Sequence, residues 1–407
     1  MIQYEVALQV LQQTASRLVL EIEDVSLLNC MGRVLAESLF SPENIPAADN
    51  SAMDGYAIRA QDTRGASQDQ PVKIKILGVL AAGAESENWD FSSKQGLEIM
   101  TGAILPKSTL DAVVRVEDVE RQGEFILVRN EIPEFSHIRK VGTDFQIGQK
   151  IVHQGTTLNE QHVLALAALG IHSFKVFRKV KVAVISTGTE IVDHALQKLK
   201  LNQVRNSSSP YLKVFLEKHH CQVDLLGSVK DEVQDFSRLL NIALSKKYDL
   251  IVTTGAVSAG KWDFVTKALP DFNFEVHFHK AAIRPGKPIL FAESKSQNTF
   301  FFGLPGNPIS TAVGAQFFIL PMLNKVMRIT ENDESFELAQ DVRKPADLEC
   351  FYKARKIKTN RGEQVQVLPG QMSYMIHSFI ESNCWVQLPA GASEIKANTK
   401  VKCLTIK

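Results

Sequence analysis

The stretch DLIVTTGAVSAGKWD, residues 249–263, is the part of the chain that best indicates how it folds. Its residues 250–252 are apolar and are typical of a short buried strand. The small residues after them can form a loop whose backbone amides close around an anion, and these are Thr253, Gly255, Ser258 and Gly260. Asp263 stands where this loop meets the next helix. A phosphorylated ligand with a divalent cation would need such amides and a carboxylate; an ordinary strand-to-helix turn is the alternative.

Strands and helices alternate around this stretch, from Lys179 to about Asn324. The pattern predicts strands at 181–185, 221–226 and 249–253, and helices at 204–218, 232–245 and 310–322. Strands separated by helices of this length indicate βαβ units and a mostly parallel sheet. In such a sheet the ligand crevice lies at the carboxyl ends of the strands, where the loops at 186–190 and 253–263 are expected.

Three acidic residues follow successive strands of this region, namely Glu190, Asp231 and Asp263. Acids from neighbouring βα loops can converge on one cation, and Mg²⁺ is commonly held by carboxylates together with substrate phosphates. The alternative for each acid alone is that it favours a helix N-terminus because of the helix dipole. As a set, the three predict a metal site.

A basic turn follows at residues 280–288, where two prolines stiffen a segment that carries Lys280, Arg284 and Lys287. Rigidly placed cations suit a phosphate or another oxyanion, because the donors need no ordering before they bind. A solvated basic turn is the alternative interpretation.

The segment FFGLPGNPIS, residues 301–310, places turn-forming residues between a buried strand and a helix. Asn307 or Ser310 is positioned to cap that helix, and its exposed amides could face an anion. Pro305 and Pro308 would shape the loop.

The N-terminal half and the C-terminal end differ from this central region in their pattern of apolar and turn-forming residues. Residues 5–38 and 158–169 carry apolar positions at helical spacing, and the two predicted helices are expected to pack together. Short strands separated by Gly and Pro predict a small β-rich domain between them. It contains the polar segments around Asp54 and Thr101, for which ordinary turns are the alternative. After residue 331, further short strands predict a β-barrel or a β-sandwich.

Composition narrows the class of protein. A chain of 407 residues is long enough for two to four domains at about 150 residues each. A net charge of +1 offers no general attraction to nucleic acid or to an anionic membrane. The five cysteines form no CxxC pair, so neither a disulfide framework nor a zinc ribbon is expected. Without a secretory leader or a stretch of about 20 apolar residues, a cytoplasmic location is expected.

Six segments, taken in order, resemble those of the MoeA family of molybdopterin molybdenumtransferases, to which the gephyrin E domain also belongs. They are DNSAMDGYA, IMTGAILP, VISTGTEIV, LIVTTGAVSAGKWD, AIRPGKP and FGLPGNP. The resemblance implies a multidomain α/β plus β fold in four parts. These are a discontinuous helical linker domain at 1–42 and 140–177, a β-rich domain at 43–139, a MogA-like α/β domain at 178–326 with a mostly parallel sheet, and a C-terminal β-barrel at 327–407.

The resemblance also implies an activity, in which molybdate is inserted into adenylylated molybdopterin with Mg²⁺, and molybdenum cofactor and AMP are released. The family's functional acids match Asp54, Glu190, Asp231 and Asp263, of which the last three would bind the metal. The positions near the ligand match Thr101, Gly255, Ser258, Gly260, Lys280, Arg284, Lys287, Pro305, Asn307 and Pro308, and less closely Lys353 and Ser373. A homodimer with a composite active site is implied, as is transient contact with a MogA-type adenylyltransferase.

The chain departs from the common family pattern at Thr189, Ala256, Ala259, Arg284, Lys353 and Met372. Arginine in place of lysine at 284 keeps the charge but changes the donor geometry, so the preferred oxyanion could shift, and tungstate is an alternative to molybdate. Two other functions stay open, namely adenylylation of molybdopterin and a scaffold of the same fold without turnover.

Overall fold

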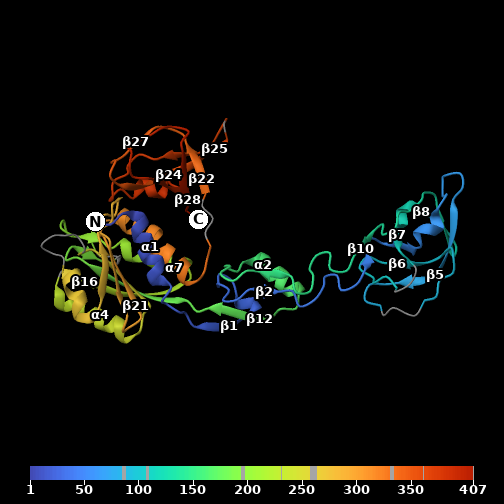
Figure 1. Ribbon diagram of the computed structural model, residues 1–407, viewed down its shortest axis with the longest axis horizontal. Helices are drawn as coiled ribbons and strands as arrows, with labels where there is room; N and C mark the ends of the chain where they lie inside the picture. Colours follow the sequence, from blue (N-terminus) through green and yellow to red (C-terminus); the bar gives the residue numbers. More distant parts are fainter. Residues whose placement is uncertain are drawn as a thin grey trace. The chain divides into compact units, whose positions relative to one another are not determined.

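The computed structural model describes residues 1–84, 89–106, 110–193, 198–230, 232–256, 264–330, 334–360 and 362–406. The chain divides into two compact units (Figure 1). Unit 1 contains Met1–Glu37, Gln154–Glu160 and Ser173–Lys407. Unit 2 contains Ser38–His153 and Gln161–His172.

A six-stranded sheet forms the centre of unit 1, in the order β16-β13-β17-β21-β20-β18. Its strands are β13 (Val180–Thr187), β16 (Cys221–Val229), β17 (Leu250–Thr254), β18 (Glu275–His279), β20 (Leu290–Ser294) and β21 (Thr299–Leu304). The first four strands in that order are parallel, and β20 and β18 add antiparallel pairs at one edge. The predicted mostly parallel sheet is therefore confirmed.

Apolar side chains cover both faces of this sheet, because successive residues of a buried strand point to opposite sides. Leu250 and Val252 of β17 face a core that includes residues of α1, α3, α6 and α7, whereas Ile251 faces α4 and α5. These helices are α1 (Tyr4–Ala15), α3 (Ser208–Lys218), α4 (Val233–Ser245), α5 (Phe264–Ala268), α6 (Pro308–Gly314) and α7 (Leu320–Val326). Helices on both faces leave the carboxyl ends of the parallel strands as the place for a ligand.

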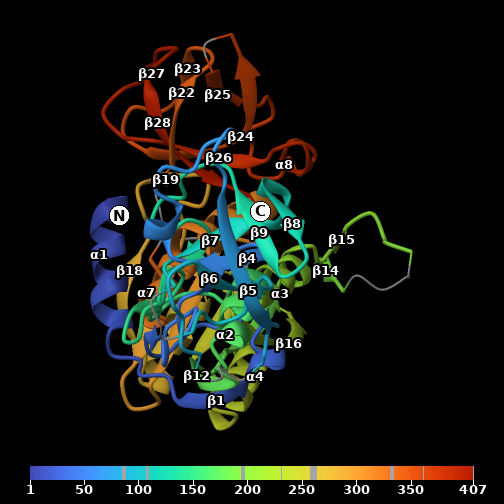
Figure 2. The same ribbon diagram turned by 90° about the vertical axis from the view of Figure 1, so that its right-hand side faces the viewer.

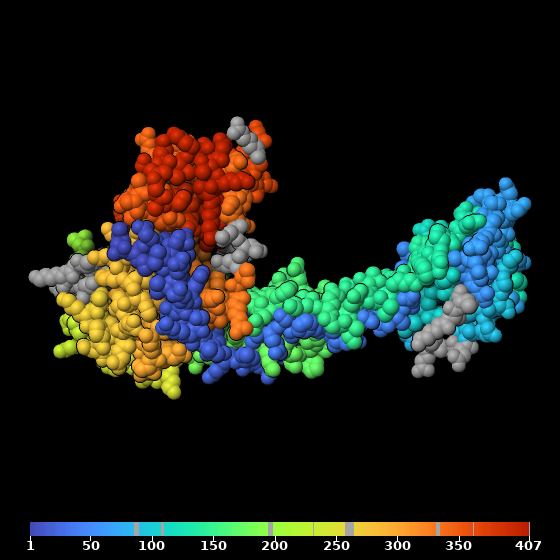
Figure 3. All heavy atoms as spheres, in the orientation of Figure 1, coloured from blue at the N-terminus to red at the C-terminus, as the bar shows by residue number. Residues whose placement is uncertain are grey.

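The N-terminal helix is shorter than predicted, and it packs on another helix of unit 1. α1 ends at Ala15, and residues 22–26 form strand β1, which pairs antiparallel with β12 (Ser173–Phe177). The prediction of helical structure through residue 38 is therefore wrong. α1 lies along α7, and Figure 3 shows the dark blue atoms of the N-terminal segment against orange atoms of the later chain. The Tyr4 hydroxyl donates a hydrogen bond of 3.2 Å to the carbonyl of Phe317. The predicted packing of this helix on the one at 158–169 involves residues of two different units and stays a prediction.

Residues 308–326 form one helical run in which α6 and α7 are joined by a π-helical turn at Ala315–Ile319. By length and composition alone this run of 19 residues could cross a membrane, and it is the one such run in the described part of the chain. Most of it is buried among the other core elements of unit 1, as in the interior helix of a globular domain.

The C-terminal region of unit 1 is a closed β-barrel, which decides between the predicted barrel and sandwich. Its strands are β22 (Glu334–Leu338), β24 (Glu349–Thr359), β25 (Gly362–Val367), β26 (Cys384–Leu388) and β28 (Lys400–Thr405). The order β24-β25-β22-β28-β26 closes because β26 pairs back to β24. Strand β19 (Ile283–Arg284), from the predicted basic turn, pairs with β24 and so joins the barrel to the α/β region.

Short elements complete unit 1. They are the pair β14 (Ile191–Val192) and β15 (Val204–Arg205), which stands out from the side of the sheet in Figure 2, the pair β23 (Val342–Arg343) and β27 (Glu394–Ile395), and helix α8 (His377–Ile380).

Unit 2 is built on a second six-stranded sheet, in the order β7-β4-β6-β5-β9-β8. Its strands are β4 (Gly55–Ile58), β5 (Val72–Leu80), β6 (Gln95–Ile99), β7 (Ala112–Arg115), β8 (Val119–Gln122) and β9 (Phe125–Val128). Gly55 is required by close packing, because a Cβ there would lie 2.1 Å from the carbonyl oxygen of Val114. Outside the sheet lie β2 (Leu39–Phe40), β3 (Asn50–Ser51), β10 (Ile138–Arg139), β11 (Lys150–Val152) and α2 (Glu160–Ala168).

Candidate functional site

A cavity of about 680 Å³ opens at the carboxyl ends of β13, β17 and β21 in unit 1. Five segments of the α/β region line it, one of them by Pro288 alone, together with one loop of the barrel. They are residues 186–188 and 190–191, residues 204–208, residues 254–256 with Pro288, residues 305–308, and residues 374 and 376. The pocket therefore lies at the edge of the sheet where the sequence predicts a ligand.

Hydroxyl groups and one amide form the polar side of this pocket. The Asn206 Nδ2 atom donates to the hydroxyls of Ser186 at 3.0 Å and Ser209 at 3.2 Å. The Asn206 Oδ1 atom accepts from the backbone N–H of Ser209 at 3.1 Å, in the first turn of α3. The Thr254 hydroxyl donates to Ser186 at 3.3 Å. This network fixes the entrance to α3 and gives the pocket both donors and acceptors for a polar ligand.

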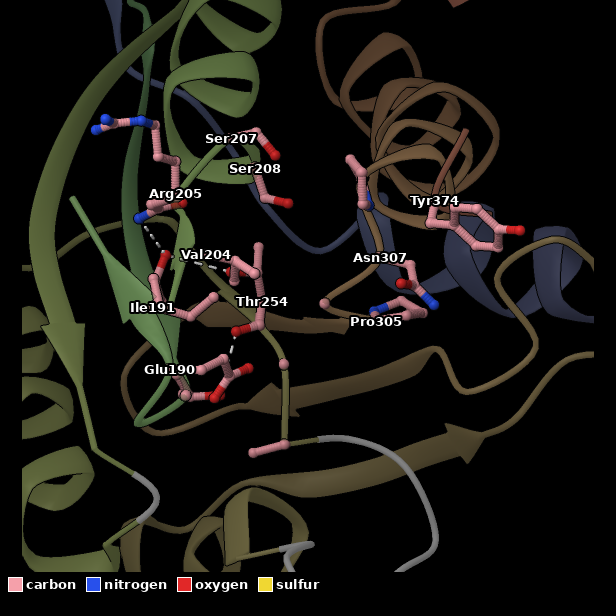
Figure 4. A pocket seen from close by; sticks show the side chains of 18 of the residues that line it. Glu190, Ile191, Val204, Arg205, Ser207, Ser208, Thr254, Pro305, Asn307 and Tyr374 are labelled. Atoms are coloured by element: carbon pink, nitrogen blue, oxygen red, sulfur yellow. Dashed lines mark hydrogen bonds between the residues drawn. The ribbon is translucent and has the colours of Figure 1, made fainter. Parts of the chain in front are cut away.

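Glu190 lies at the opposite wall of the pocket from Pro305 and Asn307 (Figure 4). Its backbone carbonyl accepts a hydrogen bond of 2.9 Å from the N–H of Val204, which ties the loop after β13 to β15. The preceding Gly188 has a φ of 140°, and a Cβ there would approach the Glu190 carboxylate within 2.9 Å. The local backbone thus leaves room for a carboxylate at the pocket.

The loop of residues 305–308 joins β21 to α6, as predicted. Asn307 occupies the N-cap position of α6 but makes no side-chain cap hydrogen bond, and its side chain points to the pocket in Figure 4. The Thr311 hydroxyl donates to the carbonyl of Pro305 at 2.8 Å, which fixes the start of the loop to helix α6. The Cβ that Gly306 lacks would be 3.6 Å from the Cα of Gly255, so this loop runs close to the one after β17.

The predicted basic turn contributes its proline rather than its cations to the lining of the pocket. Pro288 lines the pocket, whereas Lys280, Arg284 and Lys287 are not among its lining residues. Arg284 and Lys287 are exposed, and Lys280 is half-buried.

Lys353 and Ser373 belong to the barrel and touch the pocket wall indirectly. The Lys353 side chain is fully buried, and its Nζ donates to the carbonyls of Gly370 at 2.7 Å and Met375 at 2.9 Å. The carbonyl of Ser373 accepts from the N–H of Ile309 in α6 at 3.0 Å.

Asp54 and Thr101, both predicted site residues, are brought together in unit 2. One carboxylate oxygen of Asp54 accepts from the backbone N–H of Thr101 at 2.7 Å and from its hydroxyl at 2.8 Å. The backbone hydrogen bond first, and the hydroxyl second, lower the pKa of Asp54 below its ordinary value.

Replacing Thr101 by valine is expected to raise the pKa of Asp54 part of the way toward its ordinary value, because the larger backbone contribution remains. The contribution of Asp54 to stability is present above its unfolded-state pKa of about 3.9 and is lost as pH falls through the lower folded-state pKa. The variant should lose it at higher pH. NMR titration of the carboxyl carbons measures both pKa values, with Asp49, held by Lys140, as the internal control. An unchanged pKa of Asp54 would contradict the assignment.

Four predicted site residues, Ser258, Gly260, Asp231 and Asp263, lie outside the described residues. Within the parts of the chain that the structure describes, no group of three or more His, Cys, Asp or Glu side chains is arranged to hold a metal ion.

Several pocket residues escaped the sequence interpretation. Asn206 and Ser208 carry a signal, since an Asn-Ser-Ser-Ser run is a typical capping segment; the helix predicted at 204–218 in fact begins at Ser208, after strand β15. Tyr374 and Ile376 carry none, because their loop reaches the pocket only through the packing of the barrel on α6.

A doubly wound sheet with a polar pocket at the carboxyl ends of its parallel strands is typical of α/β proteins that bind small polar ligands. Three family models match the chain: the MoeA N-terminal region (domains I and II) over residues 2–170, a probable molybdopterin-binding domain over 183–325, and the MoeA C-terminal region (domain IV) over 335–406. The chain belongs to the MoeA family of molybdopterin molybdenumtransferases.

Relatives and solved structures agree with this assignment. The chain is 38% identical, over 98% of both sequences, to a protein of Synechococcus elongatus named molybdopterin molybdenumtransferase. It is 34% identical to one of the same name from Haemophilus influenzae, over 94% of this chain and 93% of the relative. A crystal structure of a molybdopterin biosynthesis MoeA protein from Pyrococcus horikosii has a TM-score of 0.81 at 29% identity and covers 100% of this chain and 99% of its own.

Proposed function

We propose that this protein inserts molybdate into adenylylated molybdopterin, in a magnesium-dependent reaction that releases AMP and yields molybdenum cofactor. The observation that carries the proposal is the polar pocket at the carboxyl ends of β13, β17 and β21, in a chain whose relatives along nearly its whole length are named molybdopterin molybdenumtransferases. A cytoplasmic location is part of the proposal.

The residues around the pocket suit a ligand with a phosphate and a polar ring. The backbone at Gly255 and the loop of Pro305, Asn307 and Pro308 come from two neighbouring strand ends and approach each other closely. Such loops can offer amides to an anion, and Ser258 and Gly260, which follow β17 in the sequence, are proposed to take part in the same binding. The hydroxyls joined by Asn206 offer both donors and acceptors to a ring.

Glu190 fits a magnesium ion of the kind that is bound by few carboxylates and completed by substrate phosphates. It places hard carboxylate oxygens at the rim of a polar pocket, and Asp231 and Asp263 follow the neighbouring strands in the sequence. When bound, the ion would supply charge neutralisation for the phosphoanhydride. The chain's own contribution is to orient the anhydride by amide and hydroxyl donors, since phosphoryl transfer depends on positioning more than on a protein nucleophile.

Lys280, Arg284 and Lys287 are proposed to hold the oxyanion, molybdate or tungstate, from the turn that also supplies Pro288 to the pocket. Ser373 would assist from the barrel loop that bonds to α6. Fixed cations and donors of this kind recognise tetrahedral oxyanions.

A second copy of the chain is proposed to complete the active site with Asp54 and Thr101. The support is chemical: the Asp54 carboxylate is held ionised by two hydrogen bonds from Thr101, and it is exposed within its own unit. An ionised, oriented carboxylate serves to bind a cation or an ammonium group. Transient contact with a MogA-type adenylyltransferase, the source of the adenylylated substrate, belongs to the same proposal.

AMP release tests the proposal directly. Purified protein with adenylylated molybdopterin and Mg²⁺ is expected to release AMP when molybdate is added, as measured by chromatography of the nucleotide. Chelation of Mg²⁺ and the Asp263→Asn substitution should each abolish the increase, and full rate in that variant would refute the role of Asp263. Competition between molybdate and tungstate identifies the preferred oxyanion.

Two outcomes would favour the other functions. Production of adenylylated molybdopterin from molybdopterin and Mg-ATP would indicate an adenylyltransferase. Tight binding of molybdopterin without any AMP release, at all molybdate concentrations, would indicate a scaffold.

A further inference from the structure

A loop of the barrel, residues 368–376, forms part of the wall of the α/β pocket. Tyr374 and Ile376 of this loop line the pocket, and Tyr374 lies on the same side as Asn307 and Pro305 (Figure 4). The hydrogen bond from the Ile309 N–H to the Ser373 carbonyl, at 3.0 Å, joins the loop to the first turn of α6. The position of this loop therefore sets the shape of one side of the pocket.

Packing of its own side chains contributes little to holding the loop. Leu368 at its start is buried, whereas four apolar residues further along the loop are 39 to 61% exposed, and these are Met372, Tyr374, Met375 and Ile376. Side chains exposed to this degree bury only part of their apolar surface, so they add less hydrophobic stabilisation than core residues do. Hydrogen bonds to the backbone of the loop must then fix its conformation.

Lys353, in strand β24 beneath the loop, supplies the central pair of these hydrogen bonds. Its Nζ reaches the carbonyls of Gly370 and Met375, which lie on either side of residues 371–374. The side chain has no exposed surface, so it has no direct access to a ligand in the pocket. The hydroxyl of Ser378 adds a bond of 2.9 Å to the same Gly370 carbonyl.

The chemistry of a buried amine suits this task. Burial lowers the pKa of Lys353 to about 8, so the amine loses its proton more readily than an exposed lysine. Either protonation state has enough N–H donors, three in the ammonium and two in the neutral amine, for the two carbonyls that Lys353 contacts. A carbonyl left without a donor in such a place would cost about 1–3 kcal/mol.

We propose that Lys353 is a positioning residue, which holds the loop of residues 368–376 so that Tyr374 forms an aromatic wall for the flat ring of the ligand. This inference rests on the proposed function, under which the ligand carries a pterin. An aromatic side chain favours stacked or edge contacts with such a ring. Tyr374 then contributes to affinity for the pterin part of the substrate, and Lys353 acts through Tyr374 rather than on the substrate.

The test compares two buried lysines of the same barrel. Lys353→Met removes the anchor. Lys344→Met is the matched control, because Lys344 is also buried and donates to two carbonyls, those of Pro345 and Leu348, at 2.9 and 3.1 Å. Amide hydrogen exchange of residues 368–376 should be at least about tenfold faster in the first variant, in line with the loss of about 1.4 kcal/mol of local stability, and unchanged in the second.

Ligand binding gives the functional readout in the same variants. The dissociation constant for molybdopterin, followed by pterin fluorescence, should rise about tenfold in Lys353→Met and stay unchanged in Lys344→Met. Tyr374→Ala should raise it by a similar factor. Lys353 and Tyr374 are proposed to act through the same side of the pocket. The dissociation constant of the double variant should therefore be no higher than that of whichever single variant binds molybdopterin less tightly.

Several results would overturn the proposal. Additive losses in the double variant, or unchanged exchange in Lys353→Met together with weaker binding, would mean that Lys353 acts on the ligand by itself. Should Lys353→Met fail to fold, Ser378→Ala must give a smaller change in the same direction, and unchanged exchange there would be decisive against the anchor. Failure of the wild-type protein to bind molybdopterin would refute the proposed function, while the exchange experiment still decides the role of Lys353.

Discussion

Glutamine in place of Glu190 is expected to slow molybdate-dependent AMP release by at least about a hundredfold, while the fold stays intact. Among the described residues that line the pocket, Glu190 is the one acidic residue. It lies across the pocket from Asn307 (Figure 4). Glutamine keeps the size of the side chain but removes the negative charge that would balance a divalent cation. The concentration of Mg²⁺ needed for half-maximal rate should rise as well.

Steady-state rates of AMP release over a range of Mg²⁺ concentrations measure this effect. Glu217→Gln is the matched control, because Glu217 is an exposed acid of the neighbouring helix α3 that pairs with Lys213. It should leave the rate unchanged. Equal rates for Glu190→Gln and wild-type protein at limiting Mg²⁺ would show that Glu190 takes no part in the reaction.

Asparagine in place of Asp249 is expected to lower the free energy of unfolding by on the order of 3 kcal/mol. Asp249 precedes β17 and is buried, and its carboxylate accepts two hydrogen bonds from Arg178, at 2.7 and 2.9 Å, and one from the N–H of Lys181 at 2.8 Å. The hydrogen bonds from Arg178 to Asp249 are the main reason why the pKa of Arg178 lies above its ordinary value. The substitution would remove the main counter-ion of a half-buried guanidinium and leave it the exposed Glu21, whose carboxylate lies 3.6 Å away.

Urea unfolding followed by circular dichroism measures this loss as a lower midpoint. Glu275→Gln is the comparison, since Glu275 pairs with Lys295 at 2.8 Å where both side chains are 60% exposed. Exposed ion pairs contribute little to stability, so that variant should unfold at the wild-type midpoint. Similar midpoints for both variants would mean that the buried pair contributes no more than an exposed one.

The α/β region was predictable from sequence because its signals are local. The strand at 250–254 begins with three apolar residues, and the helix at 233–245 has a clear apolar face, so each matches the predicted segment closely. Residues 22–38 were assigned wrongly for the opposite reason. The apolar spacing there suggests a helix, yet residues 22–26 gain their hydrogen bonds from residues 173–177, about 150 positions later in the chain.

The site divides in the same way. Glu190, Gly255 and the loop of residues 305–308 follow predicted strands, so the rule for parallel sheets brings them to one edge. Tyr374 reaches that edge only because the barrel closes and its loop bonds to α6. The role of Lys353 was equally hidden, since no sequence pattern tells whether a lysine faces a ligand or two backbone carbonyls.

The packing of α1 on α7 also has a consequence for the order in which the molecule forms. Residues 4–15 leave the ribosome first, but their apolar face, with Ala7 and Leu11, is covered by a helix that ends at Val326. During synthesis this face stays uncovered until the residues up to Val326 have also been made. The nascent chain therefore carries an unpaired amphipathic segment for most of its elongation, which is the kind of surface that chaperones bind.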